Sequence, residues 1–164
     1  MLVVAVSGSL QAASSNTSLL RALAAGDGPH EIRVWDGLGQ LPHFSPDAVP
    51  DEAVESLRKA VSEADAVLLA TPEYAGGMPG SLKNALDWLV GTGELYGKRA
   101  VVLSAAPSAE RGHNARRWLE EVLPMQGATV LASFTVPVRA ADGPGAIDAD
   151  AADVLARILA ILTE

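Results

Sequence analysis

Short apolar runs alternate along the chain with segments in which apolar residues recur every three or four positions. The runs Leu2–Val6, Ala66–Ala70 and Ala100–Leu103 are almost entirely apolar, a pattern typical of strands that are covered on both faces of a parallel sheet. Glu31–Trp35 instead alternates polar and apolar residues, which favours a strand at the edge of a sheet. Thr129–Val136 is predicted to be a fifth strand.

Five helices are predicted between and after these strands, each with an apolar stripe at helical spacing. The stripes contain Leu19, Leu20, Leu23 and Ala24, then Val54, Leu57, Val61 and Ala64, then Leu82, Ala85, Leu86 and Leu89, then Ala115, Trp118, Leu119, Val122 and Leu123, and last Ala151, Val154, Leu155, Ile158, Leu159 and Leu162. Asn16 can cap the first helix, Gly26 can end it, and Pro79 suits the first turn of the third. Strict alternation of strands and helices predicts right-handed crossovers and a doubly wound parallel α/β sheet.

Composition narrows the classes of protein to consider. A length of 164 residues fits a single domain over residues 1–164. The absence of cysteine excludes a disulfide scaffold, a Cys-ligated zinc site, an iron–sulfur cluster and a cysteine nucleophile. The formal net charge of -8 repels phosphate backbones, so no nucleic-acid partner is expected. The pair Arg116-Arg117 is expected on a solvated helix face.

The N-terminal apolar run is too short for a signal-peptide core or a membrane span, and no Lys or Arg precedes it. No other run approaches the length of a membrane span. A cytoplasmic location without a membrane partner is therefore expected.

Three loops follow the three most apolar strands. Ser7–Ser15, Thr71–Gly77 and Ser104–His113 are rich in Gly, Ser, Pro or Ala, which let a ligand approach the backbone closely. Open parallel sheets bind ligands at the carboxyl ends of their strands, where the strand order reverses. The long irregular stretch at residues 36–50 is expected either to form a wall of such a site or to be a plain surface connection.

The first loop combines small polar side chains with the start of a helix. Ser9, Ser14, Ser15 and Asn16 can donate hydrogen bonds, and the N-terminus of a helix favours a phosphate. Neither G-x-G-x-x-G nor the Walker A ending is present. The loop therefore favours a mononucleotide held by hydroxyls and backbone, with a capped turn that binds nothing as the alternative.

The second loop can offer both amide donors and a flat surface. Gly76 and Gly77 expose the backbone, and Tyr74 is an aromatic residue in a chain with only 4% of them. A flat heteroaromatic ligand could lie against this loop, whereas simple loop packing is the alternative for Tyr74. Trp88 is expected to pack on the core or on a second subunit.

The two loops, taken with the helix that follows the second, resemble a known family. The motifs are Gly8-Ser9-Leu10 with Ser14 and Asn16, then Pro72-Glu73-Tyr74, then Met78-Pro79-Gly80-x-Leu82-Lys83-Asn84-Ala85-Leu86-Asp87-Trp88. They are similar to those of the NADPH-dependent FMN reductases, a flavodoxin-like group that includes chromate, quinone and azo-dye reductases. The resemblance covers nearly the whole chain, and it implies a five-stranded sheet of order 2-1-3-4-5 with helices on both faces.

The resemblance also implies FMN as the cofactor, with NADPH or NADH as the co-substrate. The positions that match the FMN phosphate site are Ser9, Gln11, Ser14, Ser15 and Asn16. Those that match the loop along the isoalloxazine ring are Pro72, Glu73, Tyr74, Ala75, Gly76 and Gly77. Ser104 matches the start of a third flavin-side loop, and the helix at residues 79–89 resembles the one through which the family forms homodimers and homotetramers.

Three positions depart from the family pattern. Gln11 stands where the family often has Arg, and the loss of this charge partner would weaken phosphate binding by about 1.5–3 kcal/mol. Ala75 stands where Asn is usual, and Gly77 stands where Ser or a similar residue is usual. The backbone amides of both loops are unaffected by these changes.

The function implied is an FMN-dependent NAD(P)H oxidoreductase with ping-pong turnover. Hydride would pass from a nicotinamide to bound flavin and then to a small acceptor such as a quinone, azo compound, metal oxyanion or free flavin. No catalytic side chain is required, and the histidines His30, His43 and His113 form no metal-binding pair. The alternatives are a flavodoxin-like electron carrier and a flavin-free structural module of the same fold. An α/β-hydrolase is not expected, because there is no G-x-S-x-G nucleophile motif.

Overall fold

A five-stranded parallel sheet forms the centre of the computed structural model, which describes residues 1–108, 110–138 and 156–162. The strand order is β2-β1-β3-β4-β5, as the family resemblance implies. The strands are β1 (Leu2–Ser7), β2 (Glu31–Trp35), β3 (Ala66–Ala70), β4 (Arg99–Ala106) and β5 (Thr129–Pro137). The alternating strand β2 lies at an edge and the apolar strands lie inside, so both predictions are confirmed.

Helices follow the strands in the predicted alternation. They are α1 (Ser15–Ala25), α2 (Glu52–Glu63), α3 (Gly80–Val90) and α4 (His113–Met125). A short 3-10 helix, η1 (Leu38–Gln40), interrupts the irregular stretch at residues 36–50. Residues 156–162 are also helical, whereas Ala151, Val154 and Leu155 of the fifth predicted stripe lie outside the described residues. In the described parts of the chain no helix has both the length and the apolar content needed to cross a membrane.

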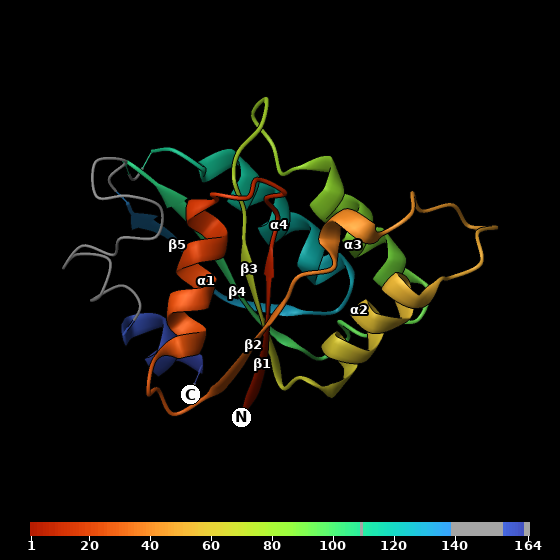
Figure 1. Ribbon diagram of the computed structural model, residues 1–164, viewed down its shortest axis with the longest axis horizontal. Helices are drawn as coiled ribbons and strands as arrows, with labels where there is room; N and C mark the ends of the chain where they lie inside the picture. Colours follow the sequence, from red (N-terminus) through yellow and green to blue (C-terminus); the bar gives the residue numbers. More distant parts are fainter. Residues whose placement is uncertain (109, 139–155, 163–164) are drawn as a thin grey trace.

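The helices cover the two faces of the sheet (Figure 1). On one face α1 and residues 156–162 pack against inward side chains such as Val3 and Ala5. On the other face α2, α3 and α4 pack against Val4 and Val6. Alternate residues of β1 thus point to opposite cores, and each fully buried aliphatic side chain contributes about 1.5–3 kcal/mol.

The start of α1 differs from the prediction. Ser14 is the N-cap residue, because its Oγ accepts a hydrogen bond from Thr17 N at 3.3 Å. Asn16 lies inside the first turn and is buried, so its prediction as the cap was wrong. Gly26 ends α1 as predicted, and Pro79 directly precedes α3 as its N-cap residue.

The loop between β2 and α2 packs against α3. Pro42 O accepts hydrogen bonds from both Asn84 Nδ2 at 2.9 Å and Trp88 Nε1 at 2.8 Å. Phe44 N donates to Asn84 Oδ1 at 2.8 Å, and the Phe44 ring stands edge-on to Trp88 with centroids 5.2 Å apart. Trp88 is 2% exposed within one subunit, so the core is the packing partner of its side chain.

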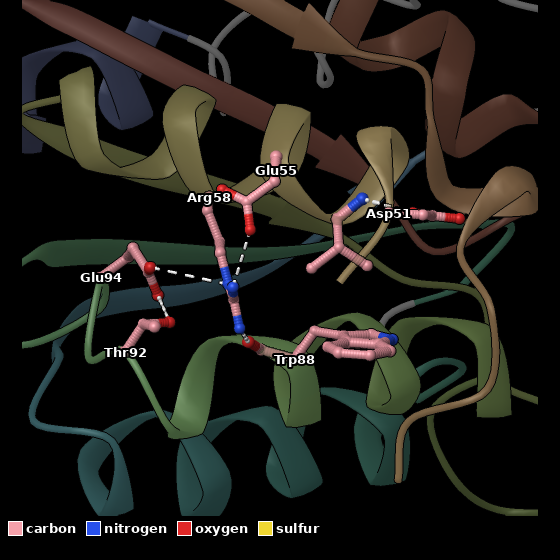
Figure 2. Close-up of polar contacts among 7 residues, drawn as sticks. Asp51, Glu55, Arg58, Trp88, Thr92 and Glu94 are labelled. Atoms are coloured by element: carbon pink, nitrogen blue, oxygen red, sulfur yellow. Dashed lines mark hydrogen bonds and ion pairs between the residues drawn. The ribbon is translucent and has the colours of Figure 1, made fainter. Parts of the chain in front are cut away.

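Arg58 of α2 ties that helix to the end of α3 (Figure 2). Its Nη2 donates to Trp88 O at 3.3 Å, near the negative end of the α3 dipole. Its Nη1 lies 2.9 Å from Glu55 Oε1, and its Nε lies 3.9 Å from Glu94 Oε1. Glu94 is held in turn by Thr92 Oγ1 at 2.8 Å. The Arg58 and Glu94 side chains are only 17% and 11% exposed, so solvent screens this pair weakly.

We expect Arg58→Ala to lower the free energy of unfolding by about 2–3 kcal/mol, because it leaves Glu94 and Trp88 O without their cationic partner. The matched control is Lys59→Ala, which removes a cation from the same helix. Lys59 is 75% exposed and lies 3.9 Å from Glu63, so this change should cost less than about 0.5 kcal/mol. Urea unfolding measures both values, and equal losses would contradict the role given to Arg58.

Candidate active site

The carboxyl ends of β1, β3 and β4 lie side by side, so the three predicted loops leave one edge of the sheet. The parallel register pairs Ser7 with Ala70 and Ala70 with Leu103. Backbone hydrogen bonds continue past the ends of the strands, from Gly8 N to Ala70 O at 2.7 Å and from Thr71 N to Leu103 O at 2.9 Å. The first residues of the loops are therefore fixed relative to one another.

Two predicted site residues hold these loops together. Asn16 Oδ1 accepts a hydrogen bond from Ala105 N at 2.9 Å, and Ser104 Oγ donates to Thr71 O at 2.9 Å. Asn16 and Ser104 are 4% and 1% exposed. Gly112, at φ +78°, passes so close to Ser104 Oγ that a Cβ would collide with it. The side chains of Asn16 and Ser104 thus position the backbone of the neighbouring loops.

The first loop presents unbonded amides at the start of α1. Ser9 Oγ accepts a hydrogen bond from Gln11 N at 3.3 Å, and Ser14 Oγ caps the helix. Within the described residues, no acceptor is bonded to the backbone N–H groups at positions 12, 13, 15 and 16. Half-buried hydroxyls of Ser9 and Ser15 stand beside them. This donor set fits a phosphate monoester.

The second loop forms a tight turn. Tyr74 N donates to Gly77 O at 3.0 Å, and Gly77 N donates to Tyr74 O at 3.1 Å. Ala75 and Gly76 between them have φ values of +50° and +76°, the pattern of a type I′ turn. In the part of the chain that the structure describes, their N–H groups have no partner. Tyr74 is 53% exposed, so the turn offers two donors and a flat side chain.

Glu73 is predicted to line the cofactor site, and its carboxylate caps α4. Glu73 Oε2 accepts hydrogen bonds from Asn114 N at 2.9 Å and from Ala115 N at 3.3 Å. The N-cap residue of α4, Gly112, has no side chain for this purpose. A carboxylate already occupies the positive end of α4. An anionic ligand at this edge is therefore directed to α1.

Trp118 lies against the second loop, although the sequence singled it out only as part of an apolar stripe. It belongs to the predicted apolar stripe of α4, yet its ring is 44% exposed. A Cβ added to Gly77 would lie 2.9 Å from Trp118 Cη2, so the ring packs directly on the turn. This contact explains why Gly77 departs from the Ser or similar residue expected there, because a side chain would push the ring away.

The prediction of a solvated face for Arg116 was wrong. Its side chain is only 8% exposed, with Nε 3.1 Å from Ser133 Oγ and Nη1 2.6 Å from Thr135 Oγ1. Burial lowers the pKa of Arg116, while Glu120 and Glu73 act in the opposite direction. Two hydroxyls of β5 satisfy the guanidinium between the helix and the sheet, whereas Arg117 lies on the exposed face as predicted.

The third loop carries an exposed acidic group at its rim. Arg111 N donates to Ser108 O at 3.2 Å. A hydrogen bond from the Ser108 side chain, helped by the backbone amide of Glu110 itself, lowers the pKa of that carboxyl. The carboxyl is fully exposed, so solvent screens its charge.

A family model described as NADPH-dependent FMN reductase matches residues 1–143. The chain belongs to this family. It is 35% identical over 108 residues to NADH-dependent flavin reductase subunit 2 of Lactobacillus johnsonii, covering 62% of this chain and 58% of that protein. It is 29% identical over 136 residues to a quinone reductase of Escherichia coli, covering 79% and 72%. The chain thus spans less than two thirds of the first of these relatives.

Solved structures agree with this membership of the FMN reductase family. FerB, a flavoenzyme NAD(P)H:(acceptor) oxidoreductase from Paracoccus denitrificans, matches with a TM-score of 0.84 at 29% identity, over 99% of this chain and 95% of that one. A flavodoxin from Pseudomonas aeruginosa matches with a TM-score of 0.63 at 18% identity, over 100% of each chain. The second likeness shows the flavodoxin-like fold.

The turn of this FMN reductase family member allows a test of backbone strain. Ala75 has a φ of +50°, which costs an alanine roughly 1 kcal/mol, whereas asparagine tolerates it. We expect Ala75→Asn to raise the free energy of unfolding by about 0.5–1 kcal/mol and Ala75→Val to lower it by more than about 1 kcal/mol. Thermal unfolding measures both variants. A valine variant as stable as the unchanged protein would contradict the left-handed turn.

Proposed function

We propose that this FMN reductase family member is an FMN-dependent NAD(P)H oxidoreductase that reduces small acceptors such as quinones, azo compounds, metal oxyanions or free flavin. One observation carries the proposal. Two separate sets of unbonded backbone N–H groups, at the start of α1 and in the turn after β3, lie at the same edge of the sheet. The names of the relatives, flavin reductase and quinone reductase, support the same reaction class.

The first loop is the proposed phosphate end of the site. The N–H groups at positions 12, 13, 15 and 16 and the hydroxyls of Ser9 and Ser15 would hold the phosphate. Ser14 supports them indirectly, because its Oγ is already bonded to Thr17 N. Gln11 is an exposed residue of the same loop and adds a neutral amide donor.

The turn after β3 is the proposed ring end. The N–H groups of Ala75 and Gly76 would donate hydrogen bonds to polar atoms of a flat ring and stabilise negative charge that develops there. The partly exposed rings of Tyr74 and Trp118 supply flat apolar surface next to these donors. Pro72 restricts the backbone where the loop begins.

FMN, when bound, supplies the two-electron chemistry that links a nicotinamide to an acceptor. The chain itself needs only to bind the flavin, to orient it and to shield it from solvent. Glu73 takes no part as a proton donor or base in this proposal, because its carboxylate is bonded to the N-terminus of α4. Asn16 and Ser104 keep the loops at fixed spacing, so both ends of the site stay aligned.

We still predict assembly as a homodimer or homotetramer through α3. A cytoplasmic location likewise stays a prediction. Loop residues 42–44 already cover the Asn84 and Trp88 side of α3. A partner subunit would therefore meet the side that carries Lys83, Asp87 and the exposed Val90.

The purified protein is expected to bind FMN, to bleach on addition of NADPH or NADH, and to pass electrons to a quinone with ping-pong kinetics. Ser15→Asp should weaken FMN binding by more than about tenfold, because it places a carboxylate among the phosphate donors. Aspartate in the first turn also favours the helix, so the fold should be retained.

The matched control is Ser45→Asp, which adds the same charge in an exposed loop at residues 36–50 and should leave FMN affinity unchanged. A protein that binds FMN but is reduced by neither nicotinamide would instead be an electron carrier. A protein that takes up no FMN at all would overturn the proposal.

A further inference from the structure

A cavity of about 370 Å³ lies between the first loop, α1 and the end of β2. Its polar lining includes Ser9 and Gln11 of the proposed phosphate loop, Thr17 and Arg21 of α1, and Asp36 after β2. Of the described residues that line this cavity, Arg21 alone carries a positive charge. Arg21 has no part in the phosphate contacts proposed above.

The first loop itself offers no positive charge. Residues 8–16 contain neither Lys nor Arg, and the whole chain carries a formal net charge of -8. A phosphate monoester brings close to two further negative charges at neutral pH. Neutral amides and hydroxyls therefore have to hold it against the field of the protein unless a cation reaches the same place.

Helix geometry directs Arg21 towards this loop. Arg21 follows Thr17 by four residues, so the two side chains lie on the same face of α1. Side chains on a helix lean towards its N-terminus, which here is the first loop. Thr17 Oγ1 is fixed there by a 2.8 Å hydrogen bond with Ser7 Oγ.

The present partner of Arg21 holds it loosely. Arg21 Nη2 lies 3.4 Å from Asp36 Oδ2, and the two side chains are 60% and 63% exposed. Exposed ion pairs of this kind contribute little to stability. A guanidinium bound to a phosphate makes stronger, paired hydrogen bonds. A ligand can therefore draw Arg21 away from Asp36 at small cost.

We propose that this cavity receives a phosphate monoester and that Arg21 is its charge partner, shared between Asp36 and the ligand. The inference rests on the proposed function, which supplies two such groups. One is the FMN phosphate, which the shared lining by Ser9 and Gln11 favours. The other is the 2′-phosphate of NADPH, which has the same chemistry.

Titration with FMN and with riboflavin, followed by flavin fluorescence, tests the proposal. Arg21→Gln should raise the dissociation constant for FMN about tenfold, and Arg21→Lys should raise it less. Asp36→Asn should have the opposite effect and lower it about two- to fivefold, because it frees Arg21 and removes a negative charge. Riboflavin lacks the phosphate, so its affinity should not change in any of these variants.

Arg33→Gln is the matched control. Arg33 lies on β2, is 58% exposed and pairs with Glu31 at 2.7 Å, so the variant makes the same change in net charge away from this cavity. The affinity of the Arg33→Gln variant for FMN should equal that of the unchanged protein. The effect of Arg21 should also shrink as salt is added, because the contact is exposed.

The outcomes separate the two proposals. If the unchanged protein binds neither FMN nor riboflavin, the proposed function fails. If it binds FMN and Arg21→Gln alters neither FMN affinity nor the ratio of KM for NADPH to KM for NADH, the inference about Arg21 is overturned and the proposed function stands. If only the KM ratio changes, the monoester site is supported and its ligand is the 2′-phosphate of NADPH.

Discussion

The parallel register of β1, β3 and β4 is the constraint on which the site depends. These strands are buried on both faces, so their register is fixed by which side chains enter each core. The carboxyl ends of the three strands therefore lie level with one another. The backbone hydrogen bonds of the sheet continue into the loops, from Gly8 N to Ala70 O and from Thr71 N to Leu103 O. The backbone donors of the candidate site therefore take their positions from the packing of the sheet.

The N-termini of α1 and α4 both lie at this edge, and they differ in whether a charged group of the chain already binds their N–H groups. Glu73 satisfies the N-terminus of α4 from within the chain, which braces the second loop against that helix. Among the described residues, only the Ser14 side chain caps the N-terminus of α1, so several amides beside it are left for a ligand. In a protein with a net charge of -8, such local donors decide where an anion can bind, because the overall field opposes it. The buried Arg116 adds positive charge between α4 and β5 without an ion-pair partner within 4.0 Å in the described residues.

Local sequence patterns predicted the elements well and their mutual contacts poorly. Glu31–Trp35 and Ala66–Ala70 were predicted with the bounds that the structure has, because run length and alternation are local properties of a strand. The cap of α1 could not be chosen from sequence, since Ser and Asn are both good cap residues. Asn16 does not cap the helix because its side chain accepts a hydrogen bond from Ala105 N, 89 residues away in the sequence. The burial of Arg116 likewise depends on hydroxyls of β5, and no periodicity within α4 indicates them. What the site can bind was indicated by motifs, whereas which side chains brace it became visible only in the folded chain.

We propose that one edge of the sheet, at the first and second loops, holds a phosphorylated flavin through backbone donors. Amide chemical shifts recorded by NMR during addition of FMN test this claim most directly. The largest changes are expected at residues 12–16 and 75–77, with small changes at the opposite edge around residues 92–98. Shifts confined to that opposite edge, or no shifts in the two loops at saturating FMN, would contradict it.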